Sequence, residues 1–531
     1  MNAIATIPAA APLLNNLSEL LTRHVQERPQ RTAVGSSDRG TVLSYSQLDV
    51  LVRSAMIQLS GLGLRRGATI ALVSDNTVEF VVGLLAIVSL GARVAPLNPA
   101  LTSDELSTRL SELSAYAVFA PRHLASKLDF ADAGAGSAAR WIMSIEGSGS
   151  DYDVRIENTH RQSPVPGVAI NTTVLIDGED VALLMFTAGT TSAPKLVPLT
   201  HGNVVSSIRD IVSGYDLSPQ DATLIVMPLF HGHGLVAGLL ATLASGGSAY
   251  LPSTGVFSAH LFWADVVRLG VTWYTAVPTI HRILLNRASQ DYPSGSRVAL
   301  RFIRSCSAPL DQELAAATSA TFRAPVISAY GMTETSHQVS SNPLPIHGSN
   351  RSASVGLPTG VQVRIAADDG KEAATASVGE IWVRGATVTT GYLNNPVANS
   401  ASFVDGWFRS GDLGNRDEDG YLFVTGRLKE IINRGGEKIS PGDVDAVLLS
   451  NAKVLEAASF GEADVTYGEN VNAAVILRPG MEATEGELRD YCRTKLSAFE
   501  VPQRIYIVAN FPRTAKDSTD RRALALQFAT G

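Results

Sequence analysis

Short apolar strings rich in β-branched residues alternate with longer segments of helical period along this chain. Strands are predicted over Thr69–Ser74 and 93–96, and helices over Thr77–Leu90 and Ser103–Leu113. Such alternation is typical of βαβ units, in which helices cover a mostly parallel sheet. The same rhythm returns between residues 182 and 251, after a stretch that contains Gly, Ser and Asp. We therefore expect an α/β fold with two βαβ-type subdomains.

The pattern changes from about Val355 to short strands separated by turn signals, which predicts a small β-rich subdomain. The strands expected there are 361–365, 379–384, 407–410 and 420–425. After the polar stretch Arg427–Gly436, β and α elements return until the end of the chain. The expected organisation is a large N-terminal domain of residues 1–428, with all three subdomains, followed by a small, mobile α+β C-terminal domain of residues 429–531.

The composition indicates a folded protein with small or neutral partners. Hydrophobic residues make up 45% of the 531 residues, which is enough to bury a large core and excludes a disordered chain. Charged residues make up only 18%, and no long run of like charges occurs. The chain thus lacks the electrostatic footprint of a protein that binds nucleic acid or an anionic membrane.

The sequence also indicates the cellular compartment of the protein. The two cysteines, Cys306 and Cys492, are far apart and form no CxxC motif, so neither a disulfide framework nor a zinc site is expected. The longest apolar run, Phe80–Ala92, is too short for a hydrocarbon core of about 30 Å and is predicted as a buried helix. Residues 1–14 do not resemble a secretory signal, and the last residues are not a peroxisomal tripeptide. We expect a cytoplasmic protein without a membrane span.

A predicted buried strand, Leu183–Phe186, runs into a turn that ends in a lysine. The turn reads Thr187-Ala188-Gly189-Thr190-Thr191-Ser192-Ala193-Pro194-Lys195. Hydroxyls and backbone N–H groups can surround an anion, and lysine supplies the compact positive charge that phosphates favour. The turn is not a Walker A loop, and a turn of this composition on its own is more often an ordinary surface loop.

Four further segments accompany this turn in chain order. They are Met-Pro-Leu-Phe-His-Gly-His-Gly at 227–234, Ser-Ala-Tyr-Gly-Met-Thr-Glu-Thr at 328–335, Trp-Phe-Arg-Ser-Gly-Asp-Leu-Gly at 407–414, and residues 426–438 with their Gly-Gly-Glu-Lys end. In this order the five segments resemble the motifs of the adenylate-forming superfamily, over nearly the whole chain. The resemblance implies that the protein uses ATP and Mg²⁺ to convert a carboxylic acid into an acyl-AMP. CoA then displaces AMP after the small C-terminal domain rotates about Lys429.

Transfer of AMP requires neutralised phosphates rather than a protein nucleophile, and the residue types fit that need. The resemblance implies these catalytic residues: Thr187, Lys195, His231, Thr333, Glu334 and, near the C-terminus, Ser518 and Lys516. Glu334 is the implied magnesium ligand. The residues implied to bind ATP or CoA are Thr187, Ala188, Gly189, Thr190, Thr191, Ser307, Ala308, Pro309, Ser328, Ala329, Tyr330, Gly331, Met332, Thr333, Asp412, Arg427, Lys429, Gly435, Gly436, Glu437 and Lys438. Of these, Asp412 and Arg427 are expected to hold the ribose hydroxyls.

The resemblance is tighter to one branch, the plant and fungal oxalyl-CoA synthetases. It rests on residues 230–238, 273–281, 301–308 and 341–343. In that branch, residues matching His233, Ser307 and His337 are linked to a small dicarboxylate, and His231 is a further candidate for substrate binding. A doubly charged acid needs donors at its distal end, which imidazole and hydroxyl groups supply without a permanent buried charge.

The last motif of the superfamily, Pro-x-Thr-x-Ser/Thr-Gly-Lys before a basic pair, is matched imperfectly. Aligning Pro512 and the pair Arg521–Arg522 puts Ser518 where the family has its catalytic lysine. Serine lacks the ammonium that bridges the carboxylate and the α-phosphate, so adenylation is expected to fall about 10²–10³-fold. Lys516 is a candidate for partial rescue, because residues two apart on a strand share a face about 6–7 Å apart. The phosphate turn departs as well, with Ala188 for serine and Leu196 for glycine.

Three functions follow from these observations. The first is an ATP-dependent ligase that joins a small carboxylic or dicarboxylic acid to CoA. The second is a repurposed adenylate-forming enzyme that passes the acyl group to an amine, or closes a lactone, and turns over without CoA. The third is a catalytically silent homologue that binds nucleotide but releases no pyrophosphate.

Overall fold

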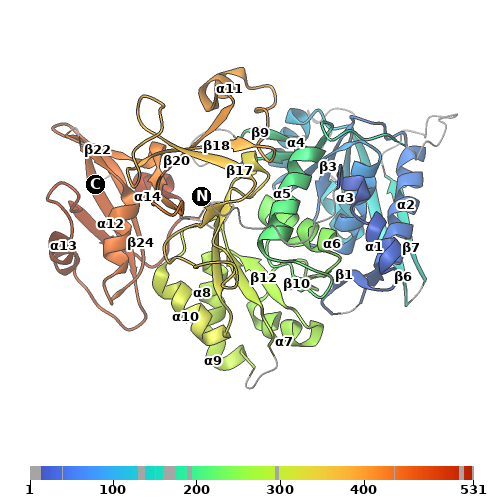
Figure 1. Ribbon diagram of the computed structural model, residues 1–531, viewed down its shortest axis with the longest axis horizontal. Helices are drawn as coiled ribbons and strands as arrows, with labels where there is room; N and C mark the ends of the chain where they lie inside the picture. Colours follow the sequence, from blue (N-terminus) through green and yellow to red (C-terminus); the bar gives the residue numbers. More distant parts are fainter. Residues whose placement is uncertain are drawn as a thin grey trace, which may run out of the picture. The chain divides into compact units, whose positions relative to one another are not determined.

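The computed structural model describes residues 14–38, 40–128, 138–149, 151–159, 174–187, 194–293, 298–435, 437–513 and 519–528 (Figure 1). The chain divides into two compact units. The first contains residues 1–186, 196–362 and 385–399, and the second contains residues 187–195, 363–384 and 400–531. The limits predicted for the two domains, 1–428 and 429–531, stay a prediction.

The first unit contains a seven-stranded, mostly parallel sheet in the order β7-β6-β5-β3-β4-β8-β9. Its strands are β3 (Thr69–Val73), β4 (Arg93–Leu97), β5 (Ala117–Pro121), β6 (Ala139–Ser148), β7 (Asp151–Asn158), β8 (Val181–Phe186) and β9 (Leu196–Thr200). The strands β7 and β9 pair antiparallel with their neighbours. The predicted strand 69–74 and helix 77–90 are observed as β3 and α3 (Val78–Ser89), and Thr77 caps the helix through the backbone N–H of Phe80.

A second, nine-stranded sheet in the same unit has the order β16-β15-β14-β13-β12-β10-β11-β1-β2. Its strands are β1 (Thr32–Ser36), β2 (Val42–Ser44), β10 (Ala222–Leu224), β11 (Ser248–Leu251), β12 (Trp273–Ala276), β13 (Phe302–Ser305), β14 (Val326–Tyr330), β15 (Ser340–Ser341) and β16 (Leu357–Pro358). Neighbouring strands from β1 through β14 run parallel except for β1 and β2. The two predicted βαβ-type subdomains are thus two sheets.

Helices cover these sheets. They are η1 (Leu17–Glu19), α1 (Thr22–Glu27), α2 (Tyr45–Gly61), α3, α4 (Ser103–Glu112), η2 (Arg122–Leu128), α5 (His201–Gly214), η3 (His233–Leu240), α6 (Ala241–Ser245), α7 (Ala259–Leu269), α8 (Pro278–Asn286), α9 (Ala288–Asp291), α10 (Gln312–Phe322) and η4 (Thr333–Thr335). The helix α3 contacts β1 of one sheet and β3 to β6 of the other, which explains why it is apolar on all sides. The longest apolar run is therefore a buried helix, as predicted. Within the described part of the chain, no helix has the length and apolar character needed to cross a membrane.

Most of the second unit consists of two five-stranded sheets. One contains β17 (Val361–Ala366), β18 (Gly379–Gly385), β19 (Phe403–Val404), β20 (Trp407–Arg416) and β21 (Leu422–Arg427), close to the strands predicted for the β-rich subdomain. The other contains β22 (Ile432–Arg434), β23 (Glu437–Ile439), β24 (Val454–Asp464), β25 (Gly468–Leu477) and β26 (Arg504–Ile507). Helices α11 (Pro396–Ser402), α12 (Pro441–Leu449), α13 (Glu485–Arg493), α14 (Arg521–Phe528) and the short η5 (Leu428–Glu430) complete the chain. The predicted α/β class with a small C-terminal α+β domain is confirmed.

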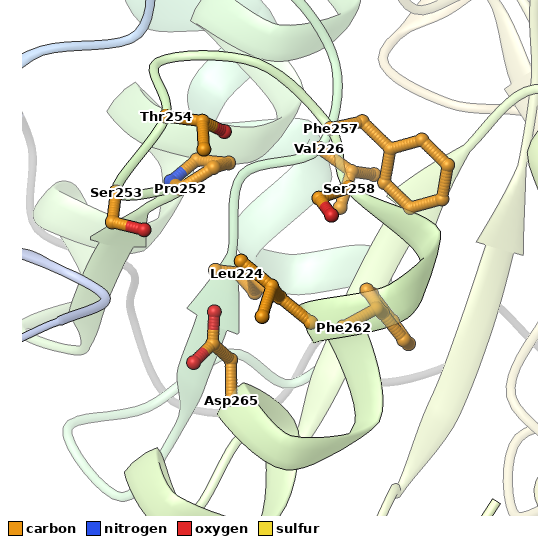
Figure 2. Close-up of a pocket in the computed structure, with 10 residues that line it drawn as sticks. Leu224, Val226, Pro252, Ser253, Thr254, Phe257, Ser258, Phe262 and Asp265 are labelled. Atoms are coloured by element: carbon orange, nitrogen blue, oxygen red, sulfur yellow. The ribbon is translucent and has the colours of Figure 1, made fainter. Parts of the chain in front are cut away.

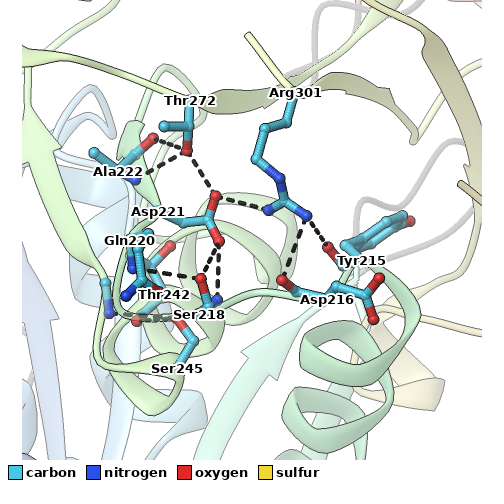
Figure 3. A network of polar contacts seen from close by, with 11 residues as sticks. Tyr215, Asp216, Ser218, Gln220, Asp221, Ala222, Thr242, Ser245, Thr272 and Arg301 are labelled. Carbon is cyan, nitrogen blue, oxygen red and sulfur yellow. Dashed lines mark hydrogen bonds and ion pairs between the residues drawn. The ribbon is translucent and has the colours of Figure 1, made fainter. Parts of the chain in front are cut away.

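A buried carboxylate fixes the amino-terminal edge of three parallel strands (Figure 3). Asp221, directly before β10, accepts hydrogen bonds from Arg301 Nη1 at 2.7 Å and from Thr272 Oγ1 at 2.8 Å. Thr272 and Arg301 directly precede β12 and β13. Because Asp221 is buried and fully engaged, it holds the starts of these strands in register.

Candidate active site

The carboxyl ends of β12, β13 and β14 lie side by side in the nine-stranded sheet. In the parallel register Thr275 lies opposite Arg304 and Ser305 lies opposite Ser328, so the residues that follow the strands leave at one edge. Ligands of open α/β sheets bind at this edge. Ser328, Ala329 and Tyr330 end β14, Gly331 and Met332 lead into η4, which carries Thr333 and Glu334, and Ser307, Ala308 and Pro309 follow β13.

The three residues predicted to bind a dicarboxylate are brought together at this edge. The buried His233 has its Nε2 atom 2.6 Å from Thr275 Oγ1 and its Nδ1 atom 3.1 Å from Ser307 Oγ. The rings of His233 and His337 stack with centroids 5.0 Å apart. His231, two residues earlier, packs its ring against Phe230 with centroids 4.6 Å apart.

The local backbone explains how His233 is positioned. His233 begins η3, a π-helical stretch, a form that is rare and frequent at functional sites. The neighbouring Gly234 lies where a Cβ atom would be 2.4 Å from the carbonyl oxygens of Met227 and Pro228. Only glycine fits there, so Gly234 is a requirement of packing. Asn76 supports the same segment, because its side chain bonds to the backbone of Ile225, Met227 and Leu229.

Three non-glycine residues of the site have left-handed backbones: Ser307 with φ of 72°, Ser336 with 51° and His337 with 88°. Such conformations cost about 1–3 kcal/mol each and persist only where the surroundings hold them. Here Ser207 Oγ donates to the carbonyl of Ser336 at 2.7 Å, and Ser336 Oγ donates to the carbonyl of Thr387 at 2.9 Å. Strain gathered in this way is typical of a binding site.

Two buried imidazoles near this edge, those of His233 and His281, have lowered pKa values and are neutral at ordinary pH. Burial, followed by the positive charges that His337 and Arg304 can carry, holds the pKa of His233 well below its usual value. Burial likewise lowers the pKa of His281 to about 3. Neutral imidazoles present one donor and one acceptor each, so they can orient an anion without adding a competing charge.

Arg304 lies at the same site, although the sequence motifs did not predict a role for it. It is completely buried on β13. Its Nε donates to the hydroxyl of Tyr215 at 2.9 Å, Nη1 to Thr275 Oγ1 at 3.1 Å and Nη2 to Gln338 Oε1 at 3.1 Å. The signal in the sequence is an arginine within the short buried strand Phe302–Ser305.

Glu334 lies near the same edge, in η4. Its Oε1 atom accepts a hydrogen bond from the Tyr392 hydroxyl at 2.8 Å, and its carbonyl accepts one from Thr389 N at 2.8 Å. Among the described residues no group of three or more His, Cys, Asp or Glu side chains could hold a metal. A single oriented carboxylate fits Mg²⁺, which is usually bound by one or two carboxylates together with substrate phosphates.

The two ends of the predicted phosphate turn pair with each other. Thr187 N donates to the carbonyl of Lys195 at 2.9 Å, and Lys195 N donates to Thr187 Oγ1 at 3.0 Å. The residues between them that were predicted to bind phosphate, Ala188, Gly189, Thr190 and Thr191, lie outside the described residues. The phosphate-binding role of this turn stays a prediction.

The second unit contains the predicted ribose ligands. Asp412 and Arg427 face each other on β20 and β21, and Arg427 Nε lies 3.1 Å from Asp412 Oδ1. Lys429, the predicted hinge, is exposed in η5, directly after this sheet. The strand β23 begins at Glu437, and Gly435 has a left-handed φ of 60° that glycine tolerates. Gly436 and the side chain of Lys438 lie outside the described residues.

The two candidate residues near the C-terminus, Lys516 and Ser518, also lie outside the described residues. The residues that flank them pair, because Arg513 and Thr519 form an antiparallel bridge. Arg521 of the basic pair donates to the carbonyl of Ser459 at 2.8 Å and forms an ion pair with Asp445. The roles of Lys516 and Ser518 therefore stay predictions.

A small pocket lies in the first unit, away from the candidate site residues (Figure 2). It lies among residues of β10, β11 and α7, and its lining includes Leu224, Pro252, Phe257 and Phe262. Its cavity of about 10 Å³ has room for roughly one water molecule. It is too small for the acid, and the predicted site residues do not line it.

Comparison with known proteins adds independent findings. The family model described as AMP-binding enzyme matches residues 21–393, and the model of the AMP-binding enzyme C-terminal domain matches residues 443–517. The chain is 42% identical over 519 residues to the oxalate–CoA ligase of Arabidopsis thaliana, which covers 97% of this chain and 99% of that protein. It is 37% identical over 484 residues to the oxalate–CoA ligase of Saccharomyces cerevisiae, with 87% of each covered. Among solved structures, ATP-bound MatB from Rhodopseudomonas palustris has a TM-score of 0.84 and 26% identity, and covers 97% of this chain and 99% of that one.

Proposed function

Because this chain belongs to the AMP-binding enzyme family, we propose that it is an AMP-forming acid–CoA ligase whose acid is a small dicarboxylate of the oxalate type. The relatives named as CoA ligases support activation with ATP and transfer to CoA. Two of them are named for oxalate, which supports the choice of acid. The two cysteines are buried and unpaired, which fits a reducing compartment, and we propose the cytoplasm.

The reaction has two steps. In the first, a carboxylate oxygen of the acid attacks the α-phosphorus of ATP, the bond to the bridging oxygen breaks, and pyrophosphate leaves. In the second, the CoA thiol gives up its proton to solvent, its sulfur bonds to the acyl carbon, and the bond from that carbon to the oxygen of AMP breaks, so AMP leaves with the oxygen it gained. No protein nucleophile takes part, so the enzyme contributes positioning and charge stabilisation.

The residues of the first unit divide these tasks. Glu334, oriented by Tyr392, would hold Mg²⁺, which when bound neutralises charge on the phosphate oxygens. Thr333 and the residues that end β14 would contact the nucleotide. Ser307 and His337 would hold the distal carboxylate of the acid, and His233, whose two ring nitrogens bond to Thr275 and Ser307, would position the Ser307 hydroxyl.

The residues of the second unit would grip the nucleotide and carry the change of conformation. Asp412 would accept hydrogen bonds from the ribose hydroxyls, with Arg427 beside it. Lys195 and the hydroxyls of its turn would neutralise the phosphates. Lys429 would act as the hinge between the two steps.

A single observation carries the choice of acid. A neutral His233, a hydroxyl and a second imidazole meet in a buried cluster where the strained Ser307 and His337 are held in place. The left-handed backbones of Ser307 and His337 lower the stability of the fold. Their presence here therefore indicates that the placement of these polar groups serves binding. Polar groups gathered this closely suit a short acid with a second anionic end.

The test is a screen of small acids for pyrophosphate release, with and without CoA. The ligase hypothesis predicts pyrophosphate release that requires oxalate, and oxalyl-CoA formation that requires CoA. Product formation without CoA would favour an enzyme with another acceptor. Binding of ATP in calorimetry without pyrophosphate release from any acid would favour the catalytically silent homologue.

A further inference from the structure

Arg304 carries a buried positive charge that has no role in either step of the proposed reaction. Its side chain is completely buried, and its hydrogen-bond partners include the hydroxyls of Tyr215 and Thr275, the amide oxygen of Gln338 and the sulfur of Cys306. Within the part of the chain that the structure describes, no carboxylate forms an ion pair with it. Taking a charge out of water is expensive unless an opposite charge compensates it. These partners solvate the guanidinium, but none of them is a carboxylate that would cancel its charge.

A chain of polar atoms leads from this charge to the proposed acid site. Thr275 lies opposite Arg304 in the parallel register of β12 and β13, and its Oγ1 atom accepts from Arg304 Nη1. The same oxygen lies 2.6 Å from His233 Nε2. Ser307 Oγ lies 3.1 Å from His233 Nδ1, on the other side of the ring.

The charge of Arg304 determines which atom is the donor in each hydrogen bond of this series. An oxygen that accepts from a guanidinium becomes a better donor, so the Thr275 hydroxyl donates to His233 Nε2. The neutral imidazole then carries its proton on Nδ1 and donates to Ser307. Since Ser307 accepts from the ring, its own proton is left to donate to a ligand.

We propose that Arg304 is a positioning residue that makes the site prefer a dianionic acid, acting through Thr275 and His233 on the hydroxyl of Ser307. The inference rests on the proposed function, because it assigns the distal carboxylate of the acid to Ser307. The second negative charge of the acid gains from the buried cation, whereas a neutral group at the same place gains little. The cation itself makes no direct contact with the acid.

Oxalate and oxamate provide a matched pair of ligands for the test. They have similar size and share one carboxylate, but oxamate carries a neutral amide at the distal end. We would measure both dissociation constants by calorimetry for the full-length protein, Thr275→Val, Thr275→Ser and Arg304→Gln. Thr275→Ser keeps the hydroxyl and is the matched control for Thr275→Val.

The expected result is a loss of at least about tenfold in the preference for oxalate over oxamate in Thr275→Val and Arg304→Gln, and no loss in Thr275→Ser. The double variant should lose no more of the preference for oxalate than either single variant, because both changes interrupt the same series of hydrogen bonds. The ¹⁵N spectrum of His233 should show an Nδ1–H tautomer in the full-length protein and in Thr275→Ser, but not in Thr275→Val. If Arg304→Gln does not fold, Thr275→Val decides.

Two failures are distinguishable. A full-length protein that binds oxalate no better than oxamate would overturn the proposed dicarboxylate function, and with it this inference. A full-length protein that prefers oxalate, together with folded Thr275→Val and Arg304→Gln variants that keep the preference, would overturn only the inference and leave Arg304 a structural role.

Discussion

Asp210 on α5 makes stability depend on pH in a direction opposite to that of most carboxylates. Its carboxylate packs against Gly360, where a Cβ atom would lie 1.9 Å from Oδ2. Burial raises the pKa of Asp210 to about 6, although Arg209 acts in the opposite sense. The folded protein therefore holds a proton here between about pH 4 and pH 6, whereas the unfolded chain has lost it.

The sign and the magnitude follow from linkage. Because the folded state binds the extra proton, the free energy of unfolding falls as the pH rises through this range and stays lower above it. The pKa rises from an ordinary value of 3.8 to about 6, and each pH unit corresponds to 1.36 kcal/mol, so the loss amounts to at most about 3 kcal/mol. Asparagine carries no charge at any pH. We expect Asp210→Asn to be more stable than the unmodified protein at pH 8, by about 1–3 kcal/mol, and equally stable near pH 4.

The assay is thermal and urea unfolding of both proteins between pH 4 and pH 8. The result that would refute the reasoning is a stability difference that does not change with pH, or a variant that is less stable at pH 8. Asp221→Asn is the matched control, because Asp221 is buried but paired with Arg301. Asparagine cannot accept all the hydrogen bonds that Arg301, Thr272 and Ser218 donate to that carboxylate, so the variant should be destabilised by about 1–3 kcal/mol.

Three further predictions concern the reaction. Ser518→Lys should raise oxalate-dependent pyrophosphate exchange at least about tenfold by restoring the missing ammonium; no gain would mean that the chemistry is carried elsewhere or that the alignment of this motif is wrong. Ser307→Ala should raise the KM for oxalate at least about tenfold in steady-state kinetics, whereas a matching rise in the KM for ATP would argue against a role at the acid. Glu334→Gln should raise the Mg²⁺ concentration needed for half-maximal pyrophosphate release about tenfold, and an unchanged magnesium titration would remove Glu334 as a ligand.

The fold was largely predictable because its elements have strong local signals. The strand β3 is a run of apolar residues with buried neighbours on both faces, and α3 begins after a threonine that caps it. The β-rich subdomain was recognisable from turn signals between short strands. The limits of the two units were harder to predict, because segments 363–384 and 400–428 group with the C-terminal residues through contacts that are distant in sequence.

The candidate site was predictable where the motifs have fixed spacing. His233, Ser307 and His337 were identified from separate strings, and the structure brings them together. Thr275 and Arg304 received no role, since their importance depends on the register between two parallel strands that are joined by a long crossover. Local periodicity says which residues of a strand are buried, but not which residue of the next strand lies beside them.

Two threonine and arginine pairs lie at opposite ends of the strands β12 and β13. The amino-terminal end of these strands is called the first edge and the other end the second edge. The pair at the first edge is structural, whereas the pair at the second is proposed to select the acid. At the amino-terminal edge, Thr272 and Arg301 both bond to the carboxylate of Asp221, so the positive charge is compensated inside the protein (Figure 3). Further along the same two strands, Thr275 and Arg304 bond to each other, and among the described residues no carboxylate forms an ion pair with Arg304.

Tyr215 connects both edges, because its carbonyl accepts from Arg301 and its hydroxyl accepts from Arg304. If the second edge were merely structural, a built-in carboxylate like Asp221 would stabilise it, as it does at the first edge. A buried cation without such a partner is instead suited to a negative charge that arrives with the ligand. Changes at the first edge should therefore lower stability without altering the choice of acid, and changes at the second should alter the choice of acid.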